Sequence, residues 1–556
     1  MDNARIIAAI IFAGSVILLA DAWFKSNQPP PATTQPATSA TTPTTSESSI
    51  PAVTTQPNAK TGETPTVSAP APSQPAATGR IVTVRTDDYE AKINTRGGIL
   101  EELDLLKHKS KVDPNASMKL FEIQGDRTYV AESGLIGQGL PNHTSLYQVD
   151  GNSFELQPGQ DKLDVVLHAT GLNGYEVVQR YTFHRDSYVI DIDYQITNHS
   201  GQPLSTYAYF QFLRDGKPAA GDTKTRPTFT GGAIYTDESK FVKVKFKDMD
   251  KGKVDYPKKA GDGWAAFVQH YFVAAWLPKQ GTEREYFTKA REHGLYAVGV
   301  ILPVSAIAPG STGSVSTRLY AGPQNQKTLA AVAPGLDLTV DYGWLTVIAA
   351  PLFWLLTAIH SWVGNWGVAI ILLTVIIKLV FYPLSAASYK SMAKMRVLAP
   401  KLQQLKETYG DDRQRMQQAM MELYKTEKIN PLGGCLPIIV QIPVFISLYW
   451  VLLASVELRN APFILWIHDL SSRDPYYVLP VLMGLSMIVQ SWLSPTPPDP
   501  VQAKIMKIMP VVFSVFFFFF PAGLVLYWLV NNILSIIQQW HITRVIERSK
   551  PANAKR

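Results

Sequence analysis

Polar side chains recur at helical spacing in the most apolar third of the chain. Four of them fall at i, i+4, i+8 and i+11, on one face of a predicted helix: Thr374, Lys378, Tyr382 and Ser385. A charged lysine is costly in lipid, so Lys378 indicates either a hydrated pocket or a side chain whose amino group reaches the membrane surface. Amino and hydroxyl groups of this kind can hold a polar segment of another molecule by hydrogen bonds.

Neighbouring apolar segments carry further polar positions: Gln441, Gln490, Tyr527, Asn531, Ser535 and Gln538. A single glutamine such as Gln441 is explained by a helix–helix hydrogen bond. Polar positions on several segments together predict a hydrated pocket, open to the cytoplasm and closed on the outer side by apolar side chains. The predicted spans after residue 366 contain no Asp or Glu, so the proton or sodium site of a coupled transporter is missing.

Covalent chemistry has weak support. Lys378 with Thr374 or Ser385 could form a Ser–Lys type of hydrolase, but side chains on one rigid helix seldom provide both nucleophile and base in attack geometry. The polar region before residue 340 has no HExxH, GxSxG or P-loop motif, and its histidines are scattered. The single cysteine, Cys435, excludes a disulfide within the chain and a cysteine cluster for metal. We therefore predict no catalytic residue, no cofactor and no metal site.

The charge distribution is typical of a membrane protein. The chain has 556 residues, of which 46% are hydrophobic and 17% charged, against about 25% charged in soluble domains. The net charge of +7 arises in residues 341–556, which hold 19 Lys or Arg and 11 Asp or Glu, while residues 80–340 hold 30 of each. Basic residues beside apolar segments follow the positive-inside rule, whereas a nucleic-acid-binding protein would carry them on a polar domain. We predict no specific nucleic-acid partner.

Residues 1–25 predict a signal-anchor span with its N-terminus in the cytoplasm. The stretch 6–24 is apolar, Arg5 precedes it, and only Asp21 interrupts it. A cleaved signal peptide is the alternative, because Ala20-Asp21-Ala22 has the form of a cleavage site. Residues 26–79 are rich in Pro, Thr, Ser, Ala and Gln, with eleven prolines, and predict an extended linker that cannot build a core.

Residues 80–325 predict a large all-β sandwich. Apolar residues alternate with polar ones between Tyr188 and Ile196, and again at Val242, Val244 and Phe246. A period of two is typical of strands with one solvated face. If the first span is retained, this domain lies outside the cytoplasm.

Five further spans are predicted, at about residues 367–382, 435–456, 477–494, 506–520 and 524–540. Residues 340–363 contain the apolar stretch Trp344–Trp362 and could form another. If they crossed the membrane, the loop 383–430 with its nine Lys or Arg would be external, against the positive-inside rule. We therefore interpret 340–363 as a helix in the outer membrane interface. The chain then has six spans and both termini inside, with 541–556 as a basic cytoplasmic tail.

The cytoplasmic loop 385–430 predicts a helical hairpin. Apolar residues step by three and four from Met392 to Tyr409, Gly410-Asp411-Asp412 marks a turn, and Met416 begins the returning seam. The simplest interpretation is that the two helices pack on each other. Methionine also suits a surface that contacts varied apolar partners.

Several motifs in residues 340–548 resemble the YidC/Oxa/Alb family of membrane insertases, in the order in which the family has them. They are Ser391-Met392-Ala393-Lys394-Met395, Asn430-Pro431-Leu432-Gly433-Gly434-Cys435, Gln441-Ile442-Pro443, Val456-Glu457-Leu458-Arg459, Trp466-Ile467-His468-Asp469-Leu470 and Pro521-Ala522-Gly523-Leu524-Val525-Leu526-Tyr527-Trp528. The anchor and the long polar domain are similar to the Gram-negative form of the family. That form implies a periplasmic β-supersandwich similar to sugar-mutarotase folds, and a five-helix insertase core, here residues 364–548.

The resemblance also implies a site. In the family a single intramembrane positive charge, often arginine, lies in a groove that faces the cytoplasm, and Lys378 matches its position. Lysine keeps the charge but lacks the guanidinium fork. The candidate substrate-groove residues are Lys378, Thr374, Tyr382, Gln441, Gln490, Tyr527, Trp528, Asn531 and Ser535.

We therefore expect a multi-pass insertase and chaperone of the cell inner membrane, which is not an enzyme. A hydrophilic segment of a client would enter the groove near Lys378, and its apolar segment would leave into the bilayer. The resemblance implies nascent membrane proteins, lipid and the Sec translocon as partners. It also implies that the ribosome and the signal-recognition-particle receptor bind at the hairpin 385–430 and the basic tail. The alternative is a transporter or channel that uses the same groove.

The six-span topology has a direct test in the full-length chain with Cys435→Ser as the background. A cysteine introduced as Trp362→Cys should react with an impermeant maleimide added to spheroplasts, and Gly410→Cys should react only after the membrane is opened. The reason is that the basic residues hold the loop 383–430 inside. External labelling of Gly410→Cys in intact spheroplasts would contradict the topology.

Overall fold

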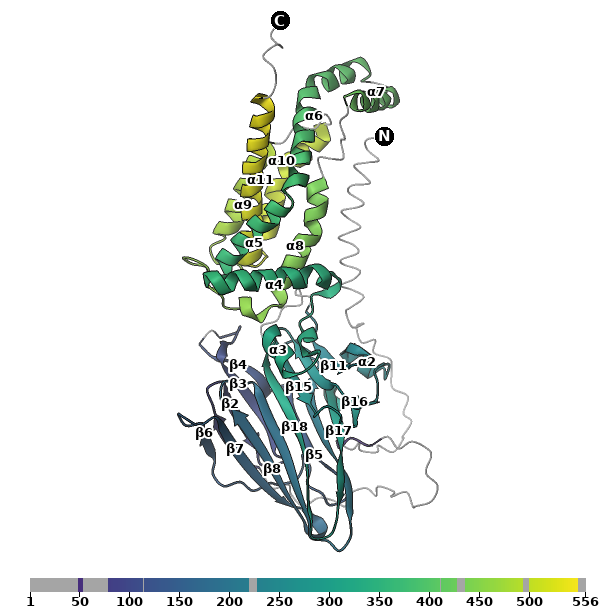
Figure 1. Cartoon of the computed structure of the whole chain (residues 1–556), viewed down its shortest axis with the longest axis vertical. Helices are drawn as coiled ribbons and strands as arrows, with labels where there is room; N and C mark the ends of the chain where they lie inside the picture. The colour runs from purple at the N-terminus through teal and green to yellow at the C-terminus, as the bar shows by residue number, and fades with distance from the viewer. Residues whose placement is uncertain are drawn as a thin grey trace, which may run out of the picture.

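The computed structural model describes residues 49–53, 79–113, 115–219, 228–410, 412–427, 436–493 and 500–548. The predicted anchor 1–25, nearly all of the linker 26–79, the motif Asn430–Cys435 and residues 549–556 lie outside these ranges. The described residues form a β-domain and a bundle of helices, and helix α4 (Thr346–Val363) lies across the boundary between them (Figure 1).

The β-domain consists of two sheets that pack face to face. The ten-stranded sheet has the order β13-β16-β17-β10-β5-β4-β3-β2-β1-β6, and the eight-stranded sheet has the order β12-β11-β14-β15-β18-β9-β8-β7. Most neighbours are antiparallel, such as β10 with β5 and with β17, whereas β1 and β6 are parallel. The strands are β1 (Ile81–Arg85), β2 (Tyr89–Asn94), β3 (Ile99–Lys109), β4 (Ser117–Gln124), β5 (Arg127–Ile136), β6 (Ser153–Glu155), β7 (Lys162–Thr170), β8 (Tyr175–His184), β9 (Val189–Asn198), β10 (Leu204–Asp215), β11 (Gly231–Thr236), β12 (Lys240–Val244), β13 (Lys259–Ala260), β14 (Trp264–Gln269), β15 (Phe272–Leu277), β16 (Arg284–Arg291), β17 (Leu295–Ile307) and β18 (Thr312–Pro323).

The alternating sequence pattern determines which face of each strand is buried. In β9 the residues Ile190, Ile192 and Tyr194 are buried in the core between the sheets, and the residues between them are partly exposed. The predicted all-β sandwich is therefore confirmed.

One strand is shorter than the pattern predicts. β12 ends at Val244, and Phe246 begins a short helix, α2 (Phe246–Asp250). The Phe246 ring packs on Tyr296 and Phe267, with centroids 4.5 and 5.9 Å away. This tertiary contact ends the strand at a point that local alternation does not mark.

The chain after the β-domain is helical. The helices are α3 (Gln326–Val332), α4, α5 (Trp366–Val380), α6 (Tyr382–Thr408), α7 (Arg413–Thr426), α8 (Leu436–Ala454), α9 (Val478–Leu493), α10 (Pro500–Phe517) and α11 (Ala522–Arg548). The five spans predicted after residue 366 fall on α5, α8, α9, α10 and α11. Among the described residues, one helix, Gly343–Val363, is long and apolar enough by itself to cross a membrane. The bent pair Trp366–Val380 and Tyr382–Met392 could form a second span, and the apolar helices Val440–Ala454, Val478–Leu493 and Lys507–Phe517 are shorter. The number of spans therefore stays a prediction.

Helix α4 runs across the bundle rather than along it (Figure 1). Ala349, Phe353 and Leu356 are buried on one of its faces. Trp354 and Trp362 are exposed on its other side, Trp362 to 91%. Exposed tryptophan rings are typical of the membrane interface. The orientation therefore supports the interfacial interpretation of residues 340–363, although length and hydropathy alone fit a span.

The prediction of one continuous helix from Thr374 to Ser385 is wrong. α5 ends at Val380, α6 begins at Tyr382, and the two are bent by 66°. Pro383 explains the break, because a proline ring lacks an N–H and is tolerated in the first turn of a new helix. The predicted stripe is therefore divided between two helices, with Thr374 and Lys378 on α5 and Tyr382 and Ser385 on α6.

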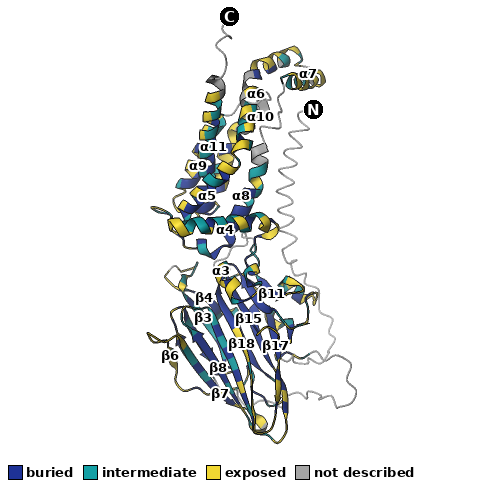
Figure 2. Cartoon of the chain, viewed as in Figure 1, coloured by how far each residue is buried: buried dark blue, intermediate teal, exposed yellow. Residues whose placement is uncertain are grey.

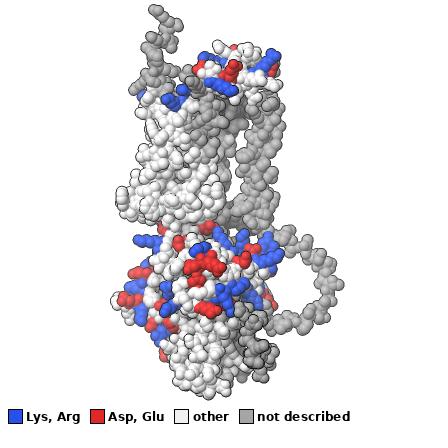
Figure 3. All heavy atoms as spheres, turned by 45° about the vertical axis from the view of Figure 1, so that its right-hand side comes forward, with Lys and Arg blue, Asp and Glu red and all other residues white. Residues whose placement is uncertain are grey.

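The outer surface of the bundle is apolar. Its exposed side chains include Leu372, Leu379, Leu485, Trp492, Val511, Phe516 and Ile537. Charged residues gather at the α6–α7 end and on the β-domain, and the face between them in Figure 3 is almost free of charge. Contact with lipid explains an exposed apolar surface of this extent better than contact with water does.

α6 and α7 form the predicted hairpin. Leu398 and Leu402 are buried, and Lys401 Nζ donates to Glu427 Oε1 at 2.7 Å. Most of the hairpin is nevertheless exposed, in contrast to the interior of the β-domain (Figure 2). The hairpin extends beyond the bundle at the end opposite the β-domain.

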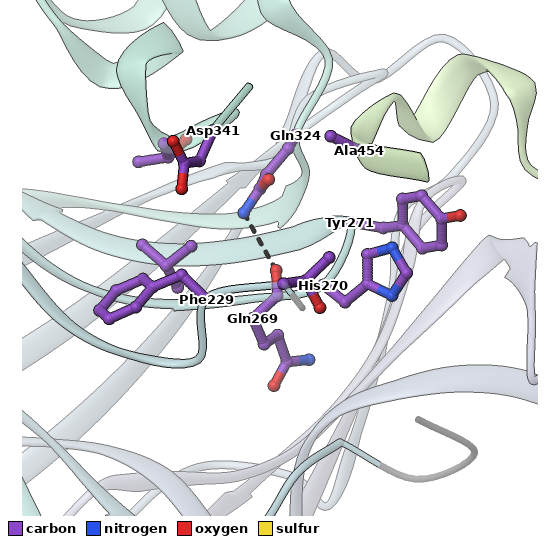
Figure 4. Close-up of a pocket in the computed structure, with 10 residues that line it drawn as sticks. Phe229, Gln269, His270, Tyr271, Gln324, Asp341 and Ala454 are labelled. Atoms are coloured by element: carbon purple, nitrogen blue, oxygen red, sulfur yellow. Dashed lines mark hydrogen bonds between the residues drawn. The ribbon is translucent and has the colours of Figure 1, made fainter. Parts of the chain in front are cut away.

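The β-domain contacts the bundle through the turn between β14 and β15. His270 and Tyr271 form this turn, and their rings stack with centroids 3.7 Å apart (Figure 4). His270 Nε2 donates to the carbonyl oxygen of Leu453, in the last turn of α8, at 2.8 Å. Gln324 supports the turn by donating from Nε2 to the carbonyl of Gln269 at 3.1 Å. The turn therefore joins the eight-stranded sheet to the end of α8.

Glu457, just after α8, is a half-buried acid in this junction. Its Oε1 accepts a hydrogen bond from Asn325 Nδ2 at 3.1 Å, and its Oε2 has no partner among the described residues. Close by, Tyr342 OH lies 3.4 Å from Ser455 Oγ. Loss of hydration raises the pKa of Glu457 to about 7. The junction therefore accommodates the neutral carboxyl better than the carboxylate.

We expect the folded chain to lose stability as the pH rises towards neutrality. Because the pKa of Glu457 is raised in the folded state, folding takes up a proton between pH 4.5 and about 7. Over that window the free energy of unfolding should fall by up to ~3 kcal/mol. Glu457→Gln should remove this fall and exceed the wild type in stability above about pH 7.

Thermal unfolding of the purified full-length chain across this pH range provides the measurement. Glu155→Gln, on the exposed end of β6, is the matched control and should follow the wild type. If the wild type and Glu457→Gln show the same pH dependence, Glu457 does not titrate in the junction.

Candidate functional site in the helical bundle

A buried lysine joins α5 to α11. Lys378 Nζ donates to Ser535 Oγ at 2.7 Å, and Lys378 is only 3% exposed. Ser535 Oγ in turn donates to the carbonyl oxygen of Asn531 at 2.7 Å. A lysine that reached the membrane surface would have its amino group in water. The position of Lys378 therefore favours an internal polar site over a helix-end anchor.

The other residues of the predicted stripe divide between two helices. Thr374 is fully buried one turn before Lys378, and its Oγ1 donates to the carbonyl oxygen of Ile370 at 2.6 Å. Tyr382 lies beyond the break between α5 and α6 and is 40% exposed. The structure therefore keeps Thr374 and Lys378 on one face and places Tyr382 on a different helix.

α11 supplies the largest part of the polar cluster. Tyr527, Asn531 and Ser535 are spaced by four residues, lie on one helical face and are buried. The Tyr527 ring stacks on Phe445 of α8 with centroids 6.4 Å apart, and Trp528 meets the same Phe445 ring edge-on at 4.7 Å. Because α11 begins at the end of the bundle nearest the β-domain, these rings lie between Lys378 and that end. This is the apolar side predicted for the pocket.

The remaining candidates lie at a similar depth in the bundle. Lys378, Gln441, Gln490 and Ser535 are each 12 or 13 residues from the end of their helix that is nearest the β-domain. At a rise of ~1.5 Å per residue this is ~18–20 Å, out of a hydrocarbon layer of ~30 Å. Gln441 and Gln490 are half-buried at that level. Four helices therefore bring polar groups to one layer.

A second polar contact joins α11 to α9 and was not found from the sequence. Asn532 Nδ2 donates to Ser486 Oγ at 3.3 Å, and Gln539 Nε2 donates to the carbonyl oxygen of Leu493 at 2.9 Å. A lone serine in an apolar helix, such as Ser486, gives little signal. α11 therefore presents two polar faces, one to α5 and one to α9.

The cluster is a positive charge among neutral hydrogen-bonding groups. Helices α5, α8 and α9 contain no Asp or Glu, and Lys378 is the one basic residue in them. Among the described residues, no group of His, Cys, Asp or Glu could hold a metal ion. Because an uncompensated cation in a low-dielectric site attracts negative charge strongly, the cluster can bind an acidic or carbonyl-rich segment.

Comparison with known proteins assigns both parts of the chain. Residues 81–355 match the family described as YidC periplasmic domain, and residues 358–550 match the family described as 60Kd inner membrane protein. Membrane protein insertase YidC of Nitrosospira multiformis is 53% identical over 578 residues, which cover 100% of this chain and 99% of that relative. The protein of the same name from Methylobacillus flagellatus is 54% identical over 566 residues and covers 100% of both chains.

A solved structure described as active YidC insertase with the first transmembrane domain resolved is also similar. It is 21% identical, covers 83% of this chain and 94% of its own, and has a TM-score of 0.39. The family matches together cover most of the chain, and the identity to the curated relatives extends over its full length. The chain therefore belongs to the YidC family of membrane protein insertases.

Proposed function

We propose that this chain inserts proteins into the inner membrane, the activity for which its relatives are named. The observation that carries the proposal is the buried hydrogen bond between Lys378 and Ser535. Well-packed apolar residues would join α5 to α11 at least as stably as a buried charge. A buried lysine at this depth is therefore better explained by binding of a polar substrate than by helix packing.

The mechanism that we propose begins with a hydrophilic client segment on the hairpin side of the bundle. Negative or carbonyl groups of that segment would displace Ser535 as the partner of Lys378, and the amides of Gln441 and Asn531 offer further hydrogen bonds. The adjoining apolar segment would then move between the helices into lipid, where burial of its surface favours insertion. This route needs no nucleotide and no covalent step.

The distribution of charge supports the orientation that we propose for the chain. The apolar surface of the bundle separates the α6–α7 hairpin from the β-domain, so the two would lie on opposite sides of the membrane (Figure 3). The basic loop 383–430 would face the cytoplasm by the positive-inside rule, and the β-domain would face the periplasm.

We also propose that the insertase acts as a chaperone and works alone or with the Sec translocon. The hairpin α6–α7 is an exposed surface on which the ribosome or the signal-recognition-particle receptor could dock, together with the basic tail. Its exposed Met421 and half-buried Met416 and Met420 suit partners of varied shape.

A transporter or channel that uses the same polar layer is the second candidate. It would need a coupling ion or an outer gate, and α5, α8 and α9 contain no acidic residue for an ion. Solute flux into vesicles that contain the purified chain would support this alternative, and insertion of clients without such flux would exclude it.

Replacement of Lys378 tests the proposed role of its charge. Lys378→Arg should retain insertion, because the charge is kept. Lys378→Ala should lower the insertion rate of a client with an acidic translocated segment about tenfold. This corresponds to the loss of ~1.4 kcal/mol of electrostatic attraction from the barrier to insertion. A paired client in which Asn and Gln replace the acids should be inserted almost normally. Protease protection of the two clients gives the measurement, with insertase amounts matched by blotting.

Lys507→Ala is the matched control, because Lys507 is an exposed lysine on α10 outside the cluster. It should insert both clients like the wild type. If Lys378→Ala inserts both clients equally well, the lysine is a structural residue and does not contact the substrate.

A further inference from the structure

The outer face of the ten-stranded sheet carries polar side chains that water does not reach. Along β10, Phe210 and Phe212 point into the core between the sheets, so Gln211 points to the opposite face. Gln211 is nevertheless only 1% exposed, and Glu132, the residue opposite it on β5, is buried as well. Other parts of the chain must therefore cover this face.

Three segments line a hollow beside these two residues. They are the loop that carries His143, the turn from Arg291 to His293, and the linker residue Ser49. Residues 49–53 are the part of the linker, apart from Gly79, that the structure describes. A short piece of the linker therefore lies on the β-domain, far in sequence from the strands that it contacts.

Two polar contacts hold Ser49 in this place. Arg291 Nη2 donates to the carbonyl oxygen of Ser49 at 2.8 Å, and His143 Nε2 lies 3.1 Å from Ser49 Oγ. The other ring nitrogen of His143 is hydrogen-bonded to the hydroxyl of Tyr209, which fixes the orientation of the imidazole. Pro51, two residues further on, is buried. The segment is therefore bound through its main chain, a hydroxyl and a proline ring.

The floor of the hollow has an acceptor that is not used. Gln211 Nε2 donates to Glu132 Oε2 at 2.7 Å, but the buried Gln211 Oε1 has no partner among the described residues. Buried amide oxygens are normally hydrogen-bonded, so this one suits a donor from a ligand. The Arg291 donor on the wall and the amide acceptor on the floor together match a peptide unit, which offers both C=O and N–H, and the His143 ring nitrogen pairs with the serine hydroxyl.

The linker sequence singles out the same residues. Between residues 26 and 79 the branched aliphatic residues are Ile50, Val53 and Val67, and two of the three lie in 49–53. Ile50 and Val53 are both half-buried. The rest of the linker is mostly Pro, Thr, Ser, Ala and Gln. Residues 49–53 can therefore bury more apolar surface per residue than the other parts of the linker.

We propose that the wall formed by Arg291 and the His143 loop, beside this hollow, is a binding groove for an extended Ser-Xaa-Pro peptide, and that residues 49–53 of the chain are its resident occupant. Docking there shortens the linker that runs from the predicted anchor to the β-domain. Residues 26–48 reach at most ~80 Å, whereas all of 26–79 would reach at most ~190 Å. The groove contains no residue of the helical bundle, so the inference goes beyond the proposed insertase function and does not depend on it.

Binding of a labelled peptide to the full-length chain in detergent tests the proposal. The probe is a fluorescein-labelled peptide with the sequence of residues 47–55, and fluorescence anisotropy measures its affinity. In one variant, residues 49–53 are replaced by Gly-Ser-Gly-Ser-Gly, which empties the groove and keeps the length of the linker. A tethered segment competes at an effective concentration of the order of millimolar. The variant should therefore bind the peptide at least tenfold more tightly than the wild type.

Two further changes show whether the peptide occupies the groove. Arg291→Gln in the emptied variant should abolish binding, because it removes the guanidinium that reaches the Ser49 carbonyl, whereas Arg318→Gln on the other sheet should leave binding unchanged. A peptide with alanine in place of Pro51 should bind more weakly. The proposal is overturned if the emptied variant does not bind the peptide at millimolar concentration, if it binds no better than the wild type, or if Arg291→Gln has no effect while the fold is intact by circular dichroism.

Discussion

The free-energy cost of holding a charged amino group away from water constrains the whole helical bundle. A buried ammonium without a partner would cost several kcal/mol, so Lys378 must meet a polar group on another element. Ser535 is that group, and the contact requires α5 and α11 to be neighbours in one particular register. The pair Asn532–Ser486 fixes α11 against α9 in the same way. α11 is therefore the helix around which the polar layer is assembled.

The end of the bundle nearest the β-domain is governed by a different constraint. The last carbonyl groups of a helix have no partner within it, and they must be satisfied where the helix leaves the apolar layer. His270 of the β-domain donates to the carbonyl of Leu453 at the end of α8, and Asn325 donates to Glu457 just beyond it. The β-domain thus completes the hydrogen bonding of the helical part. This explains why the two parts share a buried polar junction rather than a simple flexible connection.

The linker contacts the β-domain in a comparable manner. A sheet in a sandwich needs only one apolar face, and its other face can be solvated. Here part of that second face, around Gln211 and Glu132, is covered by loops and by a short piece of the linker. The β-domain therefore contacts a piece of extended chain through polar groups on the face that does not pack in the sandwich core.

Much of this organisation could be predicted from the sequence. The period of two in β9 predicted a sandwich, because in a half-buried strand the alternation of residue types alone decides which side is buried. The sequence also predicts helices around Lys378 and Asn531 and a hairpin in the basic loop, because apolar length and helical spacing are local properties. The motifs in residues 340–548 indicated the family before any contact was known.

Other features were decided only by the tertiary structure. Spacing placed Tyr382 on the face of Lys378, but Pro383 starts a new helix in a new direction. Ser486 gives no distinctive signal in the sequence, and the contacts of Glu457 and of residues 49–53 cannot be predicted from it, because each depends on a partner that lies far away in the sequence. Most strands and apolar helices, and the distribution of charge, follow from the sequence alone, since burial preference and hydration act on each segment separately. Only the tertiary structure decided which polar groups meet, because hydrogen bonds between segments depend on register and on the angles at which the helices pack.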